Sequence, residues 1–182
     1  MKRFSIAFTI LALMSLFVAS VVSAQRNPQR PGDQTIAEIA SGVPEYSILV
    51  DLLVQTGLVE VFQGRGQYTV FAPDNDAFAG FIGFLTETCG ADTTNAILSD
   101  NEIVSEVLLY HVTTGRRGAN SVVPAPGITM LNGDRAPSPG ATIDGATIEA
   151  PNLASASNGI IHGIDAVIVP DGILELVGAT CG

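Results

Sequence analysis

Residues 158–170 read NGIIHGIDAVIVP, and this pattern decides how the rest of the 182-residue chain is interpreted. His162 is followed three places later by Asp165, within a run of isoleucine and valine. A histidine and an aspartate are two members of a hydrolytic triad. The same residues also suit an ordinary buried strand, so this stretch bears on whether the protein is an enzyme.

Strand geometry separates the two polar residues. Side chains alternate between the two faces of a strand, so His162 would share a face with Ile160 and Ile164, and Asp165 would point to the other face. Only a bulge at Gly163 would bring the pair together. Apolar residues occupy both faces, which predicts a strand buried on both sides. The chain also has no Gly-x-Ser-x-Gly nucleophile elbow. We therefore interpret His162 as a buried residue hydrogen-bonded to backbone, and we expect no catalytic residues and no enzymatic activity.

The first 24 residues have the features of a secretory signal peptide. Two basic residues and a mostly apolar run precede small residues and an expected cleavage point before Gln25. The alternative is an uncleaved anchor, for which the apolar run is short. Residues 25–34 are expected to form a flexible leader, and residues 35–182 a single domain. The protein is thus expected to be secreted or extracellular, or periplasmic or cell-surface in a bacterium, without stable membrane insertion after cleavage.

The charge of the mature chain excludes one class of partner. After removal of the signal peptide, six arginines remain against 18 acidic residues, which gives a net charge of −12. Such a surface repels the phosphates of nucleic acids and the head groups of anionic lipids. We therefore expect no nucleic-acid partner.

The two cysteines, Cys89 and Cys181, favour one disulfide, because an exported protein with an even cysteine count usually pairs them. The paired positions lie 92 residues apart, and in the chain-entropy model the bridge would stabilise the fold by about 4 to 5 kcal/mol. Two free thiols are the alternative. The spacing excludes a Cys-x-x-Cys redox or zinc motif.

The first half of the chain has mostly helical patterns. Helices are predicted from a capping box at Thr35, from Pro44, and after a cap at Asp74 or Asn75. Residues 68–72 predict one strand between them, and residues 86–95 read as a polar loop. The second predicted helix has an apolar face at helical spacing, made of Tyr46, Leu49, Val50, Leu53 and Val54.

The second half has mostly strand patterns. Glycine and proline become frequent after Gly115, and three dipeptides supply the positive φ angles of tight hairpins: Asn132-Gly133, Asp144-Gly145 and Asn158-Gly159. The whole chain is therefore predicted to form an α+β domain whose helical N-terminal half covers the sheet of its strand-rich C-terminal half.

Three segments of the chain resemble the signatures of fasciclin-like (FAS1) domains. The stretch at 158–170 is similar to the second signature, YTVFAPDNDAF at 68–78 is similar to the first, and LLYHV at 108–112 matches the Tyr-His motif between them. They occur in family order and spacing, and the resemblance covers about Thr35 to Pro170. The chain is identified as a single-domain secreted member, which implies a wedge-shaped β-sandwich flanked by helices. The structural motif residues are Phe71, Pro73, Asn75, Phe78, Asn158, Gly159, His162 and Asp165.

The family resemblance also implies a function. Fasciclin-like domains are associated with cell adhesion and extracellular matrix, and in animal members the Tyr-His motif is implicated in integrin binding. The candidate contacts here are Tyr110 and His111, flanked by Leu108, Leu109 and Val112. The alternative is that this pair among leucines belongs to the core.

No motif in the sequence predicts a metal or a cofactor. Asp74-Asn75-Asp76 resembles the start of a calcium loop, but the required glycine and distal glutamate are missing. The two histidines do not have a zinc-ligand spacing. Two non-enzymatic functions therefore remain. The first is adhesion to a cell-surface or matrix protein or glycan. The alternative is carriage of an apolar small molecule such as a carotenoid, in an apolar groove beside the helix at residues 46–54.

Overall fold

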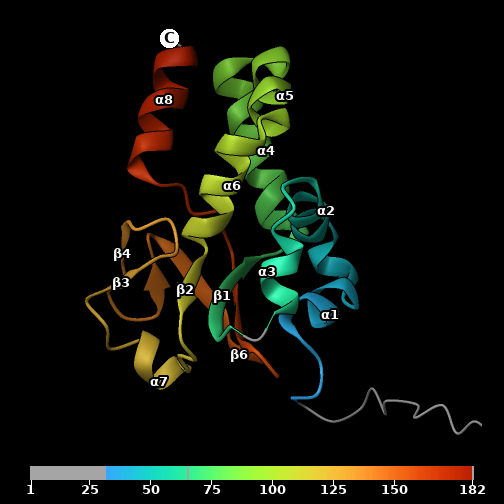
Figure 1. Ribbon diagram of the computed structural model, residues 1–182. Helices are drawn as coiled ribbons and strands as arrows, with labels where there is room; N and C mark the ends of the chain where they lie inside the picture. The colour runs from blue at the N-terminus through green and yellow to red at the C-terminus, as the bar shows by residue number, and fades with distance from the viewer. Residues whose placement is uncertain (1–31, 65, 182) are drawn as a thin grey trace, which may run out of the picture.

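A curled, mixed sheet of five strands, in the order β2-β1-β7-β6-β5, forms the centre of the molecule (Figure 1). The computed structural model describes residues 32–64 and 66–181, so the predicted signal peptide and most of the predicted leader lie outside the described residues. The helices are α1 (Ile36–Ser41), the 3₁₀ helix η1 (Pro44–Tyr46), α2 (Ser47–Gln55), α3 (Val59–Gln63), α4 (Asn75–Cys89), α5 (Ala91–Ser99), α6 (Asn101–Tyr110), α7 (Ala119–Val122) and α8 (Asp171–Cys181). The strands are β1 (Tyr68–Pro73), β2 (Val112–Thr114), β3 (Gly127–Thr129), β4 (Arg135–Pro137), β5 (Thr142–Ile143), β6 (Ala146–Ala156) and β7 (Gly159–Ile164). The predicted α+β class, with a helical first half and a strand-rich second half, is confirmed.

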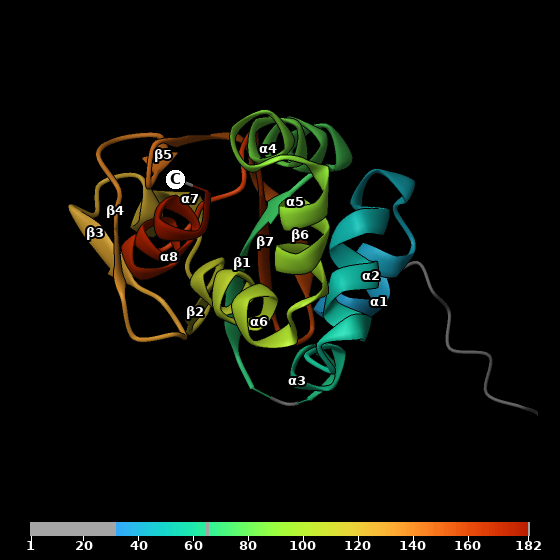
Figure 2. The same cartoon turned by 90° about the horizontal axis from the view of Figure 1, so that it is seen from above.

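Strands β1 and β7 come from opposite halves of the chain and lie side by side in the middle of the sheet. They run parallel, with Phe71 opposite His162, while β2 pairs antiparallel with β1, and β6 with β7. Seen from above, helices α1–α3 lie on one side of these strands, and the β3–β4 hairpin lies on the other (Figure 2). The two signature segments thus form the central strands, which pack on both faces.

Each face of the central strands contributes to its own hydrophobic cluster. Val70 and Ile161 belong to the cluster beneath α1–α3, whereas Phe71 and Ile164 belong to the cluster beneath the β3–β4 hairpin. Alternation along the strands accounts for this division, because neighbouring residues point to opposite faces. A strand that is apolar on both faces is stable only when both are covered, and here both are.

Most helices begin where the sequence offers a cap. Thr35 and Glu38 form the predicted capping box of α1, and the Asp74 side chain accepts the Ala77 N–H at the start of α4. The predicted polar loop at 86–95 is wrong: α4 continues to Cys89, and α5 begins at Ala91 after the single residue Gly90. Gly90 has a φ of 79°, which a glycine adopts without strain, so one residue suffices to reverse the chain.

Two further expectations differ from the structure. Val54 is 60% exposed, so the buried face of α2 consists of Leu49 and Leu53 without it. Asn158-Gly159 is not a positive-φ turn, although Asp144-Gly145 is one, with φ angles of 47° and 85°. Gly159 is needed for a different reason, because a Cβ there would lie 2.1 Å from the Tyr68 carbonyl oxygen of the neighbouring strand.

Candidate functional site

His162 and Asp165 each hydrogen-bond to backbone groups of other segments. His162 is fully buried and stacks on Phe71, with the ring centroids 5.6 Å apart. Its Nδ1 accepts the Asn152 N–H at 3.0 Å, and its Nε2 lies 2.9 Å from the Arg117 carbonyl oxygen, to which it donates. Asp165 instead accepts the Thr147 N–H at 2.7 Å. Both ring nitrogens are therefore used by backbone groups, and burial lowers the pKa of His162, so the ring is neutral.

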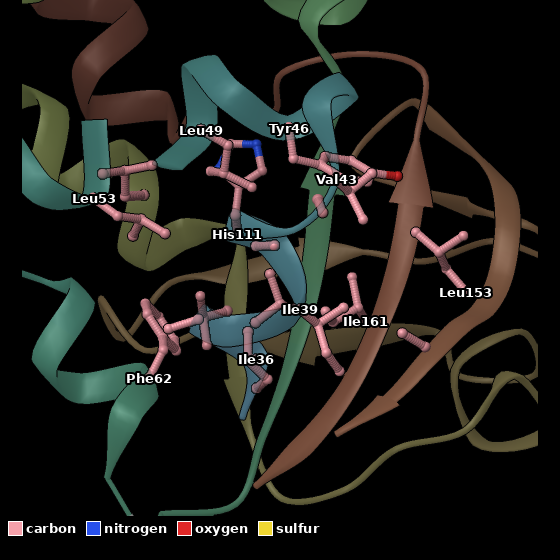
Figure 3. A pocket seen from close by; sticks show the side chains of 17 residues that line it. Ile36, Ile39, Val43, Tyr46, Leu49, Leu53, Phe62, His111, Leu153 and Ile161 are labelled. Atoms are coloured by element: carbon pink, nitrogen blue, oxygen red, sulfur yellow. The ribbon is translucent and has the colours of Figure 1, made fainter. Parts of the chain in front are cut away.

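An apolar cavity of about 160 Å³ lies between the sheet and helices α1–α3 (Figure 3). Its walls come from α1, η1, α2, α3, β1, β2, β6, β7 and the end of α6. The lining residues are Ile36, Ala37, Ile39, Ala40, Val43, Tyr46, Leu49, Leu53, Phe62, Val70, Ala72, Leu108, His111, Val112, Leu153, Ala154 and Ile161. Almost all of these side chains are hydrocarbon, so the cavity suits an apolar group and offers little to a polar one.

Polar side chains of the two signatures hold the walls of this cavity in place. Asn158 is buried; its Oδ1 accepts the Ile36 N–H at 2.8 Å, and its Nδ2 donates to the Phe62 carbonyl at 2.6 Å. One side chain thus joins the start of α1 to the end of α3. Asn75 fixes the start of α2, because its Oδ1 accepts the Ile48 N–H at 3.1 Å. These amides hold the elements around the cavity and do not line it.

His111 is the fully buried polar ring in the cavity wall, and backbone groups occupy both of its nitrogens. Its Nδ1 lies 2.7 Å from the Val107 carbonyl oxygen, to which it donates, and its Nε2 accepts the Ile168 N–H at 3.1 Å. Burial lowers the pKa of His111 to about 4, although the Val107 carbonyl partly opposes this shift. Because this neutral ring has no free polar atom, it can pack against an apolar ligand but cannot form a hydrogen bond with a polar one.

The other half of the Tyr-His motif points away from the cavity. Tyr110 packs in the cluster beneath the β3–β4 hairpin, and its side chain is 4% exposed. Burial raises the pKa of Tyr110, and the nearby Asp144 carboxylate, to which the hydroxyl donates a hydrogen bond, raises it further. The hydroxyl is therefore a neutral donor that fixes the turn between β5 and β6.

The five candidate contact residues thus lie mostly inside the protein. Leu108, Tyr110, His111 and Val112 are buried, and Leu109 is partly buried. Leu108, His111 and Val112 line the cavity. A binding role for these three is consistent with a ligand inside the protein, whereas direct contact with a partner surface would require the core to open.

A second, smaller cavity of about 40 Å³ backs onto the first. Leu108 and His111 line both cavities, so they form the partition between them. Ile173 and Val177 of α8 line the far side of the smaller cavity. A disulfide between Cys89 and Cys181 holds the end of α8 to the end of α4, with the two Cα atoms 4.5 Å apart.

Part of the cavity lining could have been recognised in the sequence. Ile36, Ile39, Ala40 and Val43 follow helical spacing on one face, a signal for α1 beyond its capping box. No periodic pattern marks Leu153 or Phe62 as lining residues, because both belong to segments with an irregular apolar pattern. Across residues 32–64 and 66–181, no three His, Cys, Asp or Glu side chains gather to hold a metal ion. Within the same residues, no helix has both the length and the apolar character to cross a bilayer.

Comparison with known protein families finds a match that covers both signature strands. The model of the Fasciclin domain family matches residues 44–170, which is well over half of the chain. The chain belongs to the fasciclin domain family. This fasciclin domain has its two signatures on β1 and β7, the central strands that separate the two clusters.

Relatives of this fasciclin domain come from bacteria and animals. Protein sll1483 of Synechocystis sp. is 31% identical over 91% of this chain and 95% of its own length. Transforming growth factor-beta-induced protein ig-h3 of Sus scrofa is 28% identical over 76% of this chain, but the match spans 21% of that longer protein. A FAS1 domain pair from the insect cell adhesion molecule fasciclin I superposes with a TM-score of 0.59 at 12% identity, over 78% of this chain and 53% of the pair. At that identity the likeness shows a shared fold alone.

The burial of His111 predicts that this fasciclin domain loses stability in acid. Its pKa is about 4 in the folded protein and 6.5 for an unperturbed histidine, so the unfolded chain takes up the proton first as the pH falls. The free energy of unfolding is expected to be constant near pH 7 and to fall by about 3 kcal/mol between pH 6.5 and pH 4 through His111. His162, whose pKa burial also lowers, adds to the same loss.

Urea unfolding at pH 7 and pH 4 measures this difference. His111→Gln keeps a donor and an acceptor but cannot titrate, so the variant should lose less stability over this interval than the wild type. An equal loss in both proteins would show that His111 does not cause the acid sensitivity.

Proposed function

We propose that this fasciclin domain is a non-enzymatic extracellular binding module that holds an apolar small molecule in the cavity between its sheet and helices α1–α3. The observation that carries the proposal is the cavity itself, about 160 Å³ and lined almost wholly by hydrocarbon. Protein interiors are normally packed without voids of this size, because an empty cavity forfeits dispersion contacts. A bound ligand would restore these contacts and so remove the energetic cost of the space.

The size of the cavity limits what can enter. An engineered apolar cavity of roughly 150 Å³ stays dry and binds benzene, so this one suits a single ring or a short branched hydrocarbon end. A longer molecule such as a carotenoid would place one end group inside and extend past the entrance. His111 offers no free polar atom, and the other polar lining group, the Tyr46 hydroxyl, lies on the side of Leu153, so an end group buried beside His111 should itself lack polar groups. We therefore propose a ligand with a compact, wholly apolar terminus.

Two observations support an extracellular site of action. The chain begins with the features of a secretory signal peptide, and Cys89 and Cys181 form a disulfide. Disulfides persist mainly in oxidising compartments outside the cytosol. An exported protein with an apolar cavity could carry a molecule that is poorly soluble in water.

The decisive experiment searches for a ligand bound to the natural protein. The protein is purified from its own cells, its absorption spectrum is recorded, and an organic extract is analysed by mass spectrometry. We expect an apolar molecule at a fixed ratio to the protein. An empty extract, together with no binding of fluorobenzene to the recombinant protein, would overturn the proposal.

Filling the cavity should abolish binding. Ala37 lies on α1, is 5% exposed and lines the cavity, so Ala37→Leu places three more carbon atoms in the space that a ligand needs. We expect the affinity for fluorobenzene, measured by ¹⁹F NMR titration, to fall by at least about tenfold, since the ring and the new side chain cannot occupy the same volume. The matched control is Ala96→Leu, the same change on the exposed surface of α5. Equal affinity in Ala37→Leu and the control would place the probe elsewhere.

Adhesion is the second candidate function. The observation that favours it is the fold shared with the FAS1 domain pair of an insect cell adhesion molecule. The partner would be a cell-surface or matrix protein or glycan. A single domain offers one copy of each motif, so adhesion would be weak for the monomer and stronger when the protein is immobilised. Attachment of cells to immobilised protein that carries no apolar ligand, and its loss in a folded Tyr110→Ala, His111→Ala variant, would favour adhesion over carriage.

A further inference from the structure

Strand β6 is irregular beside the cavity. Ala150 pairs with Gly163 and Ala154 pairs with Ile161, so three residues of β6 lie opposite the single residue His162 of β7. The two extra residues form a bulge that bends the strand and redirects its side chains. Asn152, in the middle of the bulge, has a φ of 54°, in the left-handed region that asparagine tolerates better than most residues.

A set of hydrogen bonds holds this bulge to the core. The Asn152 N–H donates to Nδ1 of His162, and Nε2 of His162 donates to the Arg117 carbonyl. The Ala119 N–H in turn donates to Oδ1 of Asn152 at 3.0 Å. His162 is itself fully buried and stacked on Phe71, so the anchor of the bulge is rigid.

The bulge carries Leu153 to the entrance of the cavity. Leu153 is 45% exposed, the most exposed of the lining side chains, and Tyr46 approaches it from η1. A Cβ on Gly163 would lie 3.2 Å from the Tyr46 hydroxyl oxygen and 3.8 Å from Leu153 Cδ2, so both side chains close in over this bare glycine. Figure 3 shows the Tyr46 hydroxyl pointing toward the side of the cavity on which Leu153 lies.

We propose that Leu153 is the gate of the cavity and that the bulge, held by the hydrogen bonds of His162 and of the Asn152 side chain, positions it. This inference rests on the proposed function. Leu49, Leu53 and Phe62 are buried side chains of α2 and α3, so they can move out of the wall only if these helices unpack. Leu153 is half-exposed and lies in an irregular segment, so its displacement opens the cavity at the lowest cost. A ligand enters and leaves when Leu153 turns away from Tyr46.

A gate changes the rates of entry and exit by the same factor and leaves the equilibrium unchanged. In Leu153→Ala the obstruction is removed, so the association and dissociation rate constants of fluorobenzene should both rise by about tenfold. The dissociation constant should change by less than about threefold. Exchange ¹⁹F NMR spectroscopy on the full mature chain measures all three quantities. The matched control is Leu174→Ala, an exposed leucine on α8 with a similar exposed fraction, 47%, which should alter none of them.

A second variant tests whether the Asn152 side chain helps to hold the bulge that positions Leu153. Asn152→Gly keeps a residue that adopts the left-handed backbone but removes the acceptor of the Ala119 N–H, so the bulge loosens without a change in the cavity wall. Both rate constants should rise here too, by a smaller factor than in Leu153→Ala.

The outcomes separate the gate from the binding function on which it rests. No binding of fluorobenzene by the wild type would overturn the proposed function and the gate together. Binding by the wild type, with an association rate that Leu153→Ala leaves unchanged, would overturn the gate alone. A weaker affinity with an unchanged association rate would show that Leu153 is a wall contact.

Discussion

Replacing His162 with alanine is expected to lower the free energy of unfolding by about 4 kcal/mol. The side chain is fully buried, and its removal leaves the Asn152 N–H and the Arg117 carbonyl without their partner. Each of these partly buried backbone groups costs about 1–3 kcal/mol when it is left without a partner, and the lost stacking on Phe71 leaves a void beside it. Urea unfolding of the two proteins at pH 7 measures the difference.

Two further variants separate a structural role from a catalytic one. His162→Gln can still donate and accept a hydrogen bond, so it should recover part of the loss. Asp165 is exposed and accepts one N–H, from Thr147, so Asp165→Ala should cost much less than His162→Ala. Unchanged stability in His162→Ala, together with the loss of a hydrolytic activity that the wild type has, would contradict the structural role.

The positions of His162 and Asp165 were only partly predictable from a local rule. β7 is regular from Gly159 to Ile164, so the two-residue alternation of a strand holds around His162. The strand ends before Asp165, which the sequence pattern placed within it, so alternation does not account for the position of Asp165. The same rule places Ile161 in one cluster and Ile164 in the other. Patterns that depend on the immediate neighbours along the chain, such as alternation and caps, were therefore read correctly from the sequence.

Features that depend on distant residues were not predictable in the same way. A tight hairpin does join β6 to β7, with Ser157 and Asn158 between the paired Ala156 and Gly159. The predicted positive φ angles of Asn158 and Gly159 are absent. Asn158 instead bonds to Ile36 and Phe62, and Gly159 is needed for the close approach of Tyr68, and these distant partners leave no trace in the local sequence. The one-residue link at Gly90 was missed because polar residues on exposed helices resemble a loop.

The cavity depends even more strongly on residues that are distant in the sequence. Its walls combine α1 with strand segments more than one hundred residues further along the chain, including Leu153 and Ile161. A cavity is the volume that these side chains fail to fill, and no periodicity along the chain reports an unfilled volume. The sequence predicted that a carrier would need an apolar groove beside residues 46–54, and the structure places Tyr46, Leu49 and Leu53 in the cavity wall.

Removing the Cys89–Cys181 disulfide is expected to lower the free energy of unfolding by about 4 kcal/mol. The two cysteines are 92 residues apart, and opening so large a loop raises the entropy of the unfolded chain by about that amount at room temperature. Reduction, or the Cys89→Ser, Cys181→Ser variant, compared with the oxidised wild type by urea unfolding, measures the loss. The double variant treated with the same reductant is the control and should not change.

Removal of the disulfide should also destabilise α8 locally. No residue of α8 is buried, and only Ile173, Val177 and Cys181 are even partly buried, on one stripe of the helix that faces the small cavity. In Figure 1, α8 stands at one side of the helical layer and forms the C-terminal end of the described chain. Such a helix buries too little apolar surface to stay docked through packing alone.

Hydrogen exchange therefore distinguishes the two parts of the expected effect. In the reduced protein the amides of α8 should exchange much faster than in the oxidised protein, while those of β1 and β7 should stay protected up to global unfolding. Release of α8 while the fold persists would also raise the entropy of the native state and bring the measured loss below the chain-entropy value. Two alkylatable thiols in the native secreted protein, or equal unfolding free energies with and without reductant, would contradict the prediction, because α8 would then be held by packing that its exposed surface does not show.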